Sequence, residues 1–286
     1  MIVAHTRAEL KAARAKLNSP VVFVPTMGAL HEGHRALLRK ARELAGSGGA
    51  VVVSIFVNPL QFGPGEDLDR YPRTLPEDLE VCAAAHVDLV FAPSIREMYP
   101  EDQLVTVDPG PAGEILEGEF RPGFFRGVLT VVLKLFSLAR PDAAVFGEKD
   151  AQQLAMVRRM VSDFALGIEI ESVPTVRERD GLAASSRNKY LSAPERAVAP
   201  VLHDALAAGA ASAAAGPRAV LDAAWGVLNE AGSAVSVDYV ELVEWGTFRP
   251  VRDDDYRGAA VLALAARVGA TRLIDNVAVR FDAADN

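Results

Sequence analysis

Runs of β-branched residues alternate with amphipathic segments over the first 175 residues. Strands are predicted by the apolar runs at 21–25, 51–56, 88–93, 142–147 and 168–174. Helices are predicted by the i, i+3, i+4 spacing of apolar residues or by long apolar stretches at 34–45, 75–85, 128–139 and 150–164. Strands that alternate with helices indicate a parallel, doubly wound sheet, whose ligands bind at the carboxyl ends of the strands.

The composition changes after the turn-rich segment RERDGLAASSRNKYLS (177–192). Two Ala-rich helical stretches follow, and then three strand-like runs separated by turn residues, at 194–214, 217–231, 236–244, 259–268 and 271–281. We therefore expect an α/β domain over residues 1–175 and a smaller α+β domain over residues 176–286.

The bulk composition narrows the class of protein. The 286 residues are 50% hydrophobic and 24% charged, as in ordinary globular proteins. A net charge of −8 disfavours nucleic acid as a partner, because nucleic-acid binders carry a basic face. We expect no secretory signal, because the first ten residues already carry charge and lack an apolar core. The longest apolar run is cut by Lys134, far short of the roughly 18 residues that span a bilayer. The single cysteine, Cys82, fits a buried thiol and a cytoplasmic location without membrane contact.

The segment PTMGALHEGH (25–34) directly follows the first long strand and opens a helix. A glycine-containing turn at a helix N-terminus exposes backbone N–H groups that favour phosphate. His31 and His34 would share one face if both lay in the first turn. A zinc site is disfavoured because the second histidine comes one residue too early for H-E-x-x-H. Taken alone, the motif also fits a capped helix with two surface histidines.

The segment SIFVNPLQFGPGEDLDRYPRT (54–74) leaves the second long strand as a loop rich in Pro and Gly. It carries Asn58 and Gln61, whose side-chain amides both donate and accept hydrogen bonds. Gln61 could therefore bind a hydroxyl and a carboxylate together. Alone, the segment is only a loop.

The segment FGEKDAQQLAMVRR (146–159) is another strand–turn–helix junction. Lys149 stands at the helix entrance and offers a compact positive charge to triphosphate oxygens, and Gln153 lies one turn further in. Asp150 could help to organise Mg²⁺ and the nucleotide. The alternative is an ordinary N-cap beside a solvated lysine.

The segment DGLAASSRNKYLS (180–192) lies at the expected domain boundary. Ser185 and Ser186 offer short donors, and the Arg187 guanidinium forms a fork suited to phosphate. A polar linker is the alternative.

In combination, HEGH on a first helix and a basic, serine-containing loop after the last strand resemble the HIGH and KMSKS-type pair of the nucleotidyltransferase superfamily. More closely, PTMGALHEGH, SIFVNPLQF, RYPRT, RPGFFRGV, FGEKDAQQL and DGLAASSRN, in this order, resemble the pantothenate synthetase family over nearly the whole chain. The resemblance implies a Rossmann-like domain with a HIGH-type nucleotide site, a smaller C-terminal lid and a homodimer. It implies an AMP-forming ligase that joins pantoate to β-alanine through an acyl-adenylate, with ATP as substrate and Mg²⁺ as cofactor.

The resemblance also implies roles for individual residues. The ATP contacts would be Met27, Gly28, Ala29, Leu30, His31, Glu32, Gly33, His34, Gly147, Glu148, Lys149, Asp150, Val176, Ala184, Ser185, Ser186 and Arg187. Pantoate and β-alanine would be bound by Gln61, Gln153 and Asn58. The catalytic residues would be His34, His31, Lys149 and Arg187. The protein ligands of the metal stay unknown.

Three positions depart from the family pattern. Phe124 stands where histidine is common, Ala151 where an aromatic residue is common, and Ala184 where Leu or Met is common. None removes an implied phosphate ligand, so we expect altered site shape with the same reaction. The rival functions are a nucleotidyltransferase that stops at nucleotidyl transfer and a nucleotide-sensing module without turnover.

Overall fold

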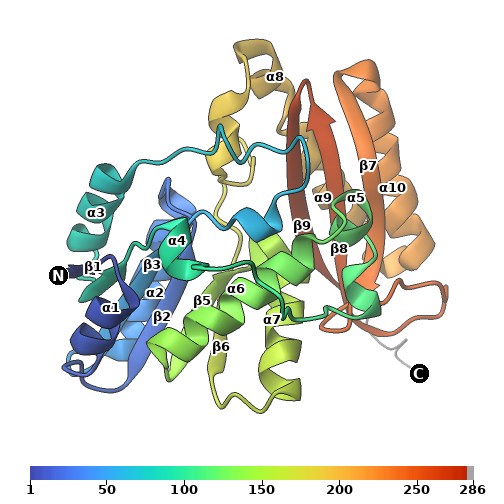
Figure 1. The fold of residues 1–286 in the computed structure, drawn as a ribbon. Coiled ribbons are helices and arrows are strands. Elements are labelled where there is room, and N and C mark those ends of the chain that lie inside the picture. The colour runs from blue at the N-terminus through green and yellow to red at the C-terminus, as the bar shows by residue number, and fades with distance from the viewer. Residues whose placement is uncertain (282–286) are drawn as a thin grey trace. The chain divides into compact units, whose positions relative to one another are not determined.

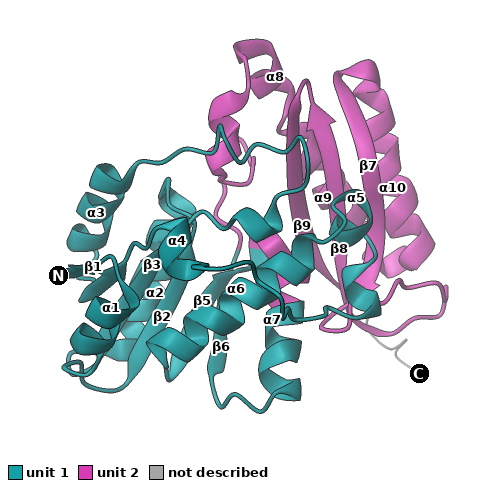
Figure 2. Cartoon of the chain, viewed as in Figure 1, with its two compact units in different colours: residues 1–148, 156–174 teal, residues 149–155, 175–286 magenta. Residues whose placement is uncertain are grey.

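The computed structural model describes residues 1–281 (Figure 1), which divide into two compact units (Figure 2). Unit 1 comprises residues 1–148 and 156–174. Unit 2 comprises residues 149–155 and the chain from residue 175. The division at residue 175 expected from the sequence remains a prediction, and the structure groups the short segment 149–155 with unit 2.

Unit 1 is built on a six-stranded sheet in which every neighbouring pair is parallel. The strands in spatial order are β1 (Ile2–Ala4), β4 (Leu89–Phe91), β3 (Ala50–Ile55), β2 (Val21–Thr26), β5 (Ala143–Gly147) and β6 (Glu169–Val173). After β2, the chain first adds β3 on one side of β2 and later adds β5 on the other side. The order therefore reverses between β2 and β5, which confirms the predicted doubly wound α/β fold.

The central strands β2 and β3 are nearly continuous apolar runs because both faces of the sheet are covered there. Val22 and Val24 pack in one core with residues of α2 (Glu32–Ala45). Phe23, between them, points to the other face, where its ring meets Phe136 of α6 (Phe124–Ala139) with centroids 6.2 Å apart. Alternate residues of one strand thus anchor helices on opposite faces.

The remaining helices of this part of the chain are α1 (Arg7–Arg14), α3 (Leu75–Ala84), α4 (Ile95–Met98), α5 (Glu117–Phe120) and α7 (Ala151–Asp163), with 3₁₀ turns at Pro59–Gln61, Pro111–Gly113 and Glu148–Asp150. The sequence reasoning overlooked the strand β1 and the helices α1, α4 and α5 in this part of the chain. The overlooked β1 is three residues long, and α1 begins with a capping box between Thr6 and Glu9. None of the helices within residues 1–281 is long and apolar enough to cross a membrane.

Unit 2 contains an antiparallel three-stranded sheet, which confirms the predicted α+β unit. Its elements are α8 (Ala193–Val198), α9 (Val201–Ala211), α10 (Pro217–Glu230), β7 (Val235–Glu244), β8 (Gly258–Val268) and β9 (Thr271–Phe281), with further 3₁₀ turns at Ser186–Tyr190, Ala213–Ala215 and Gly232–Ala234. Leu262 and Leu264 of β8 share a core with Leu206 of α9. The helical stretch predicted over 194–214 is broken at Pro200, which has no backbone N–H to continue a helix.

Two helical glycines of unit 2 give a matched test of this packing. A Cβ on Gly209 would lie 2.5 Å from Leu262 Cδ2 and 2.9 Å from the Val220 carbonyl oxygen, whereas a Cβ on Gly226 would meet nothing within 4 Å. We expect Gly209→Ala to lower the free energy of unfolding by about 1–3 kcal/mol through overpacking. Gly226→Ala should raise it by up to about 1 kcal/mol through helix propensity. Urea denaturation measures both, and equal effects would contradict the packing.

Candidate active site

Three of the predicted motifs begin at one edge of the unit 1 sheet. The strands β3, β2 and β5 are neighbours and parallel, so their carboxyl ends, at Ile55, Thr26 and Gly147, lie along the same edge. The turn after β2 and the turn after β5 flank the point where the strand order reverses. Ligands of doubly wound sheets bind at such a point.

The turn after β2 is held by a buried carboxylate from α3. Asp78 Oδ2 accepts the Ala29 N–H at 3.0 Å, and Asp78 Oδ1 accepts the Leu30 N–H at 2.7 Å. Gly28 allows this approach, because it has a φ of 83° and a Cβ there would lie 2.8 Å from Asp78 Oδ2. The expectation that this turn presents its N–H groups to phosphate is therefore wrong for Ala29 and Leu30. The sequence reasoning missed Asp78, which sits in an ordinary acidic helix start.

His31 and His34 form a reciprocal cap at the start of α2. His31 is the N-cap residue and has an extended backbone, so it precedes the first turn and the two histidines do not share a face of that turn. The Gly33 N–H donates to His31 Nδ1 and the His31 N–H donates to His34 Nδ1, each at 3.2 Å. A ring that accepts at Nδ1 carries its hydrogen on Nε2. Both rings, with centroids 4.2 Å apart, are thereby set to donate from Nε2.

Asn58 is buried, and its hydrogen-bonding capacity is used within unit 1. Its Nδ2 donates to Gln61 Oε1 and to the Gly127 carbonyl oxygen, both at 3.1 Å. Its Oδ1 accepts the Tyr99 hydroxyl at 2.9 Å and the Leu60 N–H at 3.3 Å. Burial raises the pKa of Tyr99 above its ordinary value, which keeps the phenol protonated as a donor. The Asn58 side chain thus has partners for both its amide hydrogens and its oxygen within unit 1, and its assignment to substrate stays a prediction.

Gln61 ends the 3₁₀ turn Pro59–Gln61 and lies against the turn after β2. Its Nε2 is 3.1 Å from Met27 Sδ. Helix α6 packs closely against this 3₁₀ turn at Gly127, where a Cβ would lie 2.0 Å from the Leu60 carbonyl oxygen. This close contact limits where the turn can lie. The structure therefore brings together the predicted substrate residue Gln61 and the predicted nucleotide residue Met27.

Arg121 supports the same turn and was missed as a site residue, although it lies in the RPGFFRGV segment. Its guanidinium donates to the Gln61 carbonyl oxygen at 3.1 Å and to both carboxylate oxygens of Glu66, at 2.8 and 2.6 Å. Arg121 Cζ also lies 3.7 Å from the centroid of the Phe124 ring. The Phe124 ring therefore does more than fill space, since its face holds a cation.

Other predicted nucleotide residues of unit 1 are placed around these turns. Glu32 is exposed and pairs with Arg35 at 3.2 Å, and Gly147 closes β5. Glu148 Oε1 accepts the Ser172 hydroxyl at 2.8 Å. Gly33 and His34 lie in the first turn of α2.

Lys149, Asp150 and Gln153 belong to unit 2. Lys149 and Asp150 lie in the 3₁₀ turn that precedes α7, with Lys149 Nζ 3.8 Å from Asp150 Oδ1. Gln153 lies in the first turn of α7 and is half-buried, as is Ala151. The structure thus has lysine at the helix entrance and the amide just beyond it, as the sequence predicts.

The remaining predicted residues form one loop of unit 2. The Ala184 N–H donates to the Val176 carbonyl oxygen at 2.9 Å, which brings two predicted nucleotide contacts together. Ser185 caps the following 3₁₀ turn by accepting the Arg187 N–H at 3.2 Å, and Ser186 is buried. Arg187 is half-buried beside them.

A family model described as pantoate-beta-alanine ligase matches residues 2–278. The chain belongs to this family. The pantothenate synthetase of Thermobifida fusca is 62% identical over 285 residues, covering 96% of this chain and 95% of that protein. That of Acidothermus cellulolyticus is 58% identical over 283 residues, covering 98% and 92%.

Solved structures of family members have the same fold. Pantothenate synthetase from Thermus thermophilus aligns with a TM-score of 0.90 at 48% identity, covering 97% of this chain and 99% of that one. Pantoate-beta-alanine ligase from Francisella tularensis, solved in complex with β,γ ATP and β-alanine, aligns with a TM-score of 0.79 at 34% identity, covering 97% of each chain.

The carboxylate that holds the turn after β2 can be tested by Asp78→Asn. The amide replaces one acceptor oxygen with a donor, which leaves either Ala29 N–H or Leu30 N–H unpaired. We expect the free energy of unfolding to fall by about 1–3 kcal/mol, the cost of one buried unsatisfied group. Urea denaturation measures it, with exposed Glu80→Gln on the same helix as control. Equal stability of the two variants would contradict this role.

Proposed function

We propose that this chain is an AMP-forming ligase that condenses (R)-pantoate with β-alanine at the expense of ATP. The observation that carries the proposal is the contact of Gln61 Nε2 with Met27 Sδ at 3.1 Å, which sets a substrate-type amide beside the nucleotide turn of the ligase family. The Francisella tularensis relative, solved with an ATP compound and β-alanine, supports the same ligands here.

The reaction has two steps. A pantoate carboxylate oxygen attacks the α-phosphorus of ATP, the bond from that phosphorus to the bridging oxygen breaks, and pyrophosphate leaves. The neutral amine of β-alanine then attacks the acyl carbon, the bond to AMP breaks, and the amine loses a proton. No protein nucleophile takes part, and burial raises the pKa of Cys82 to about 12, so its thiol stays protonated.

Catalysis then rests on alignment and on stabilising charge at the phosphate oxygens. We assign this stabilisation to the Nε2–H groups of His34 and His31, the ammonium of Lys149 and the guanidinium of Arg187. The nucleotide contacts implied by the resemblance fill the remainder of the ATP site. Gln61 and Gln153 are assigned to pantoate, and Asn58 acts through Gln61.

Mg²⁺ belongs to the proposal as the partner of the ATP phosphates, where it neutralises charge. Magnesium bound to a nucleotide takes few protein ligands, often one or two carboxylates. Asp150, beside Lys149, fits that role, and within residues 1–281 no three His, Cys, Asp or Glu side chains cluster as a metal cage. The homodimer implied by the resemblance and the cytoplasmic location expected from the sequence belong to the proposal as well.

The two rival functions predict different outcomes with the same substrates. A nucleotidyltransferase would leave a nucleotide-linked product, and a sensing module would bind ATP without turnover. Gln61 and Gln153 favour a small hydroxy acid over the first rival, and the paired imidazoles with Lys149 and Arg187 favour turnover. Incubation with ATP, Mg²⁺, pantoate and β-alanine separates the three, because only the ligase forms AMP and the amide.

The two-step order predicts that pantoate and ATP alone release pyrophosphate, to about one equivalent per site. The adenylate would then stay on the protein until the amine arrives. Rapid-quench measurement of pyrophosphate with and without β-alanine tests this. Absence of pyrophosphate until β-alanine is added would rule out the order.

Single removal of a phosphate donor should reduce turnover without unfolding the protein. We expect His34→Ala and Lys149→Ala each to lower kcat by on the order of 10² to 10³, as is typical for one preorganised donor. The controls are His5→Ala and Lys16→Ala, which replace exposed residues of the same types. Steady-state kinetics on the folded variants measure the loss, and near-normal turnover of His34→Ala or Lys149→Ala would refute its assignment.

Phe124→His restores the residue common in the family at this position. Because neutral imidazole can also lie under the Arg121 guanidinium, we expect kcat/KM to change by less than about tenfold. Phe124→Leu, which keeps an apolar side chain without a ring face, isolates the cation–π contact with Arg121. A hundredfold change in Phe124→His at unchanged Tm would place Phe124 in the catalytic machinery.

A further inference from the structure

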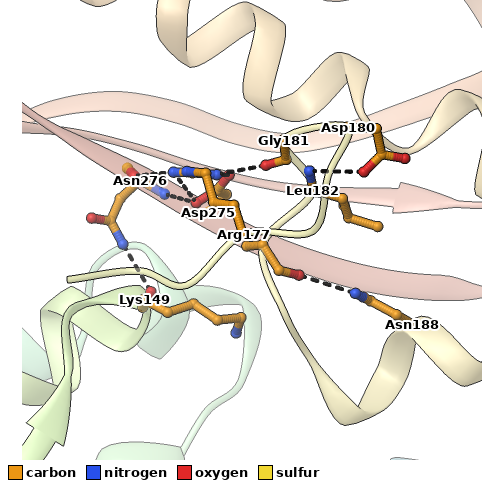
Figure 3. A network of polar contacts seen from close by, with 9 residues as sticks. Lys149, Arg177, Asp180, Gly181, Leu182, Asn188, Asp275 and Asn276 are labelled. Atoms are coloured by element: carbon orange, nitrogen blue, oxygen red, sulfur yellow. Dashed lines mark hydrogen bonds and ion pairs between the residues drawn. The ribbon is translucent and has the colours of Figure 1, made fainter. Parts of the chain in front are cut away.

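Strand β9 buries a carboxylate among apolar neighbours. Asp275 is 4% exposed and lies opposite Leu264 of β8. Such a group is costly unless it is paired and hydrogen-bonded. Arg177 pairs with it in a two-point contact, Nη1 to Oδ2 at 2.6 Å and Nη2 to Oδ1 at 3.1 Å (Figure 3). The Asn276 N–H adds a third bond, to Oδ1 at 2.8 Å.

The same guanidinium fastens a folded-back loop to β9. Arg177 Nη1 also donates to the Gly181 carbonyl oxygen at 3.0 Å, and Nη2 donates to the Asn276 carbonyl oxygen at 3.2 Å. The loop closes on itself through the bond from Ala184 N–H to the Val176 carbonyl oxygen. Its outgoing arm runs directly into residues 185–187, the predicted phosphate loop.

The next residue of β9 holds the other predicted phosphate-binding segment of unit 2. Asn276 Nδ2 donates to the Lys149 carbonyl oxygen at 2.8 Å, as Figure 3 shows. Lysine reaches its ligand on a flexible four-carbon stem. Fixing its main chain restricts the region that Nζ can sample. Adjacent residues of one strand, Asp275 and Asn276, therefore define the positions of both segments.

We infer that Asn276 is a positioning residue for Lys149, and that Arg177 with Asp275 positions the Ser185–Arg187 loop. Neither role requires contact with substrate. The inference rests on the proposed function, since it takes Lys149 and Arg187 as donors to phosphate.

A double-mutant cycle tests the Asn276 role on the full chain with ATP, Mg²⁺, pantoate and β-alanine. If Asn276 acts through Lys149, Asn276→Ala should lower kcat about tenfold in the wild-type background and less than about twofold in Lys149→Ala. Val277→Ala, next on the strand and packed on the unit 2 core, is the control for lost stability. An equal loss in both backgrounds, or an equal loss of kcat in Val277→Ala, would overturn the role.

A second cycle tests the Arg177 role. Arg177→Lys keeps the charge beside Asp275 but loses the two-point contact, so the protein should fold with a looser loop. We expect kcat/KM for ATP to fall about tenfold in the wild-type background and less than about twofold in Arg187→Ala. Hydrogen exchange should speed up at the amides of 176–187 in Arg177→Lys. Unchanged exchange, or equal losses in both backgrounds, would overturn this role.

The outcomes separate the two levels of the proposal. A wild-type protein that forms no AMP and no amide refutes the proposed function. An active wild-type protein whose Asn276→Ala and Arg177→Lys variants match it in kcat and kcat/KM refutes only the positioning roles.

Discussion

Parallel pairing of β2 with both β3 and β5 is the constraint on which the rest of unit 1 depends. Because the three strands run in the same direction, the turns that follow them leave from one edge of the sheet. Opposite faces of β2 are covered by α2 and α6, so the strand is held on all sides. The turn carrying His31 and the 3₁₀ turn carrying Gln61 can meet only because this pairing sets their starting points.

Buried polar side chains then set the shape of the segments that the sheet brings together. Asp78 accepts two backbone N–H groups, Asn58 makes four bonds around the Gln61 turn, and Asp275 accepts three bonds from Arg177 and Asn276. A buried polar group left unpaired is expensive, so each of these residues permits few alternative backbone arrangements. Rigid placement of donors before substrate arrives is what electrostatic catalysis requires.

The residue at position 124, where the family commonly has histidine, contacts Arg121 in this protein. Histidine would offer a donor at this position, whereas the phenyl ring offers a face. The Arg121 guanidinium occupies that face while it also bonds Glu66 and the Gln61 carbonyl oxygen. Phe124 therefore helps to hold the Gln61 turn in place through its contact with Arg121.

The sequence by itself determined the alternation of strands and helices, the α+β character of the C-terminal unit and the motifs that identify the family, because periodicity and turn residues act locally. It missed β1, which is too short to show a period. It also predicted one continuous helical stretch across Pro200, because the Ala-rich pattern continues on both sides of that residue. Only the tertiary structure decided that the Asp78 carboxylate accepts hydrogen bonds from the Ala29 and Leu30 N–H groups. Likewise, only the tertiary structure decided that Asn58 faces inward and that Asn276 holds Lys149. Asp78 and Ala29 are 49 positions apart in the sequence, and Asn276 and Lys149 are 127 positions apart, so no local pattern could predict these partners. Asn58 and Gln61 are only three positions apart. For Asn58, the sequence places Gln61 nearby in the same loop, but it does not indicate the distant partners Gly127 and Tyr99 that bury the side chain.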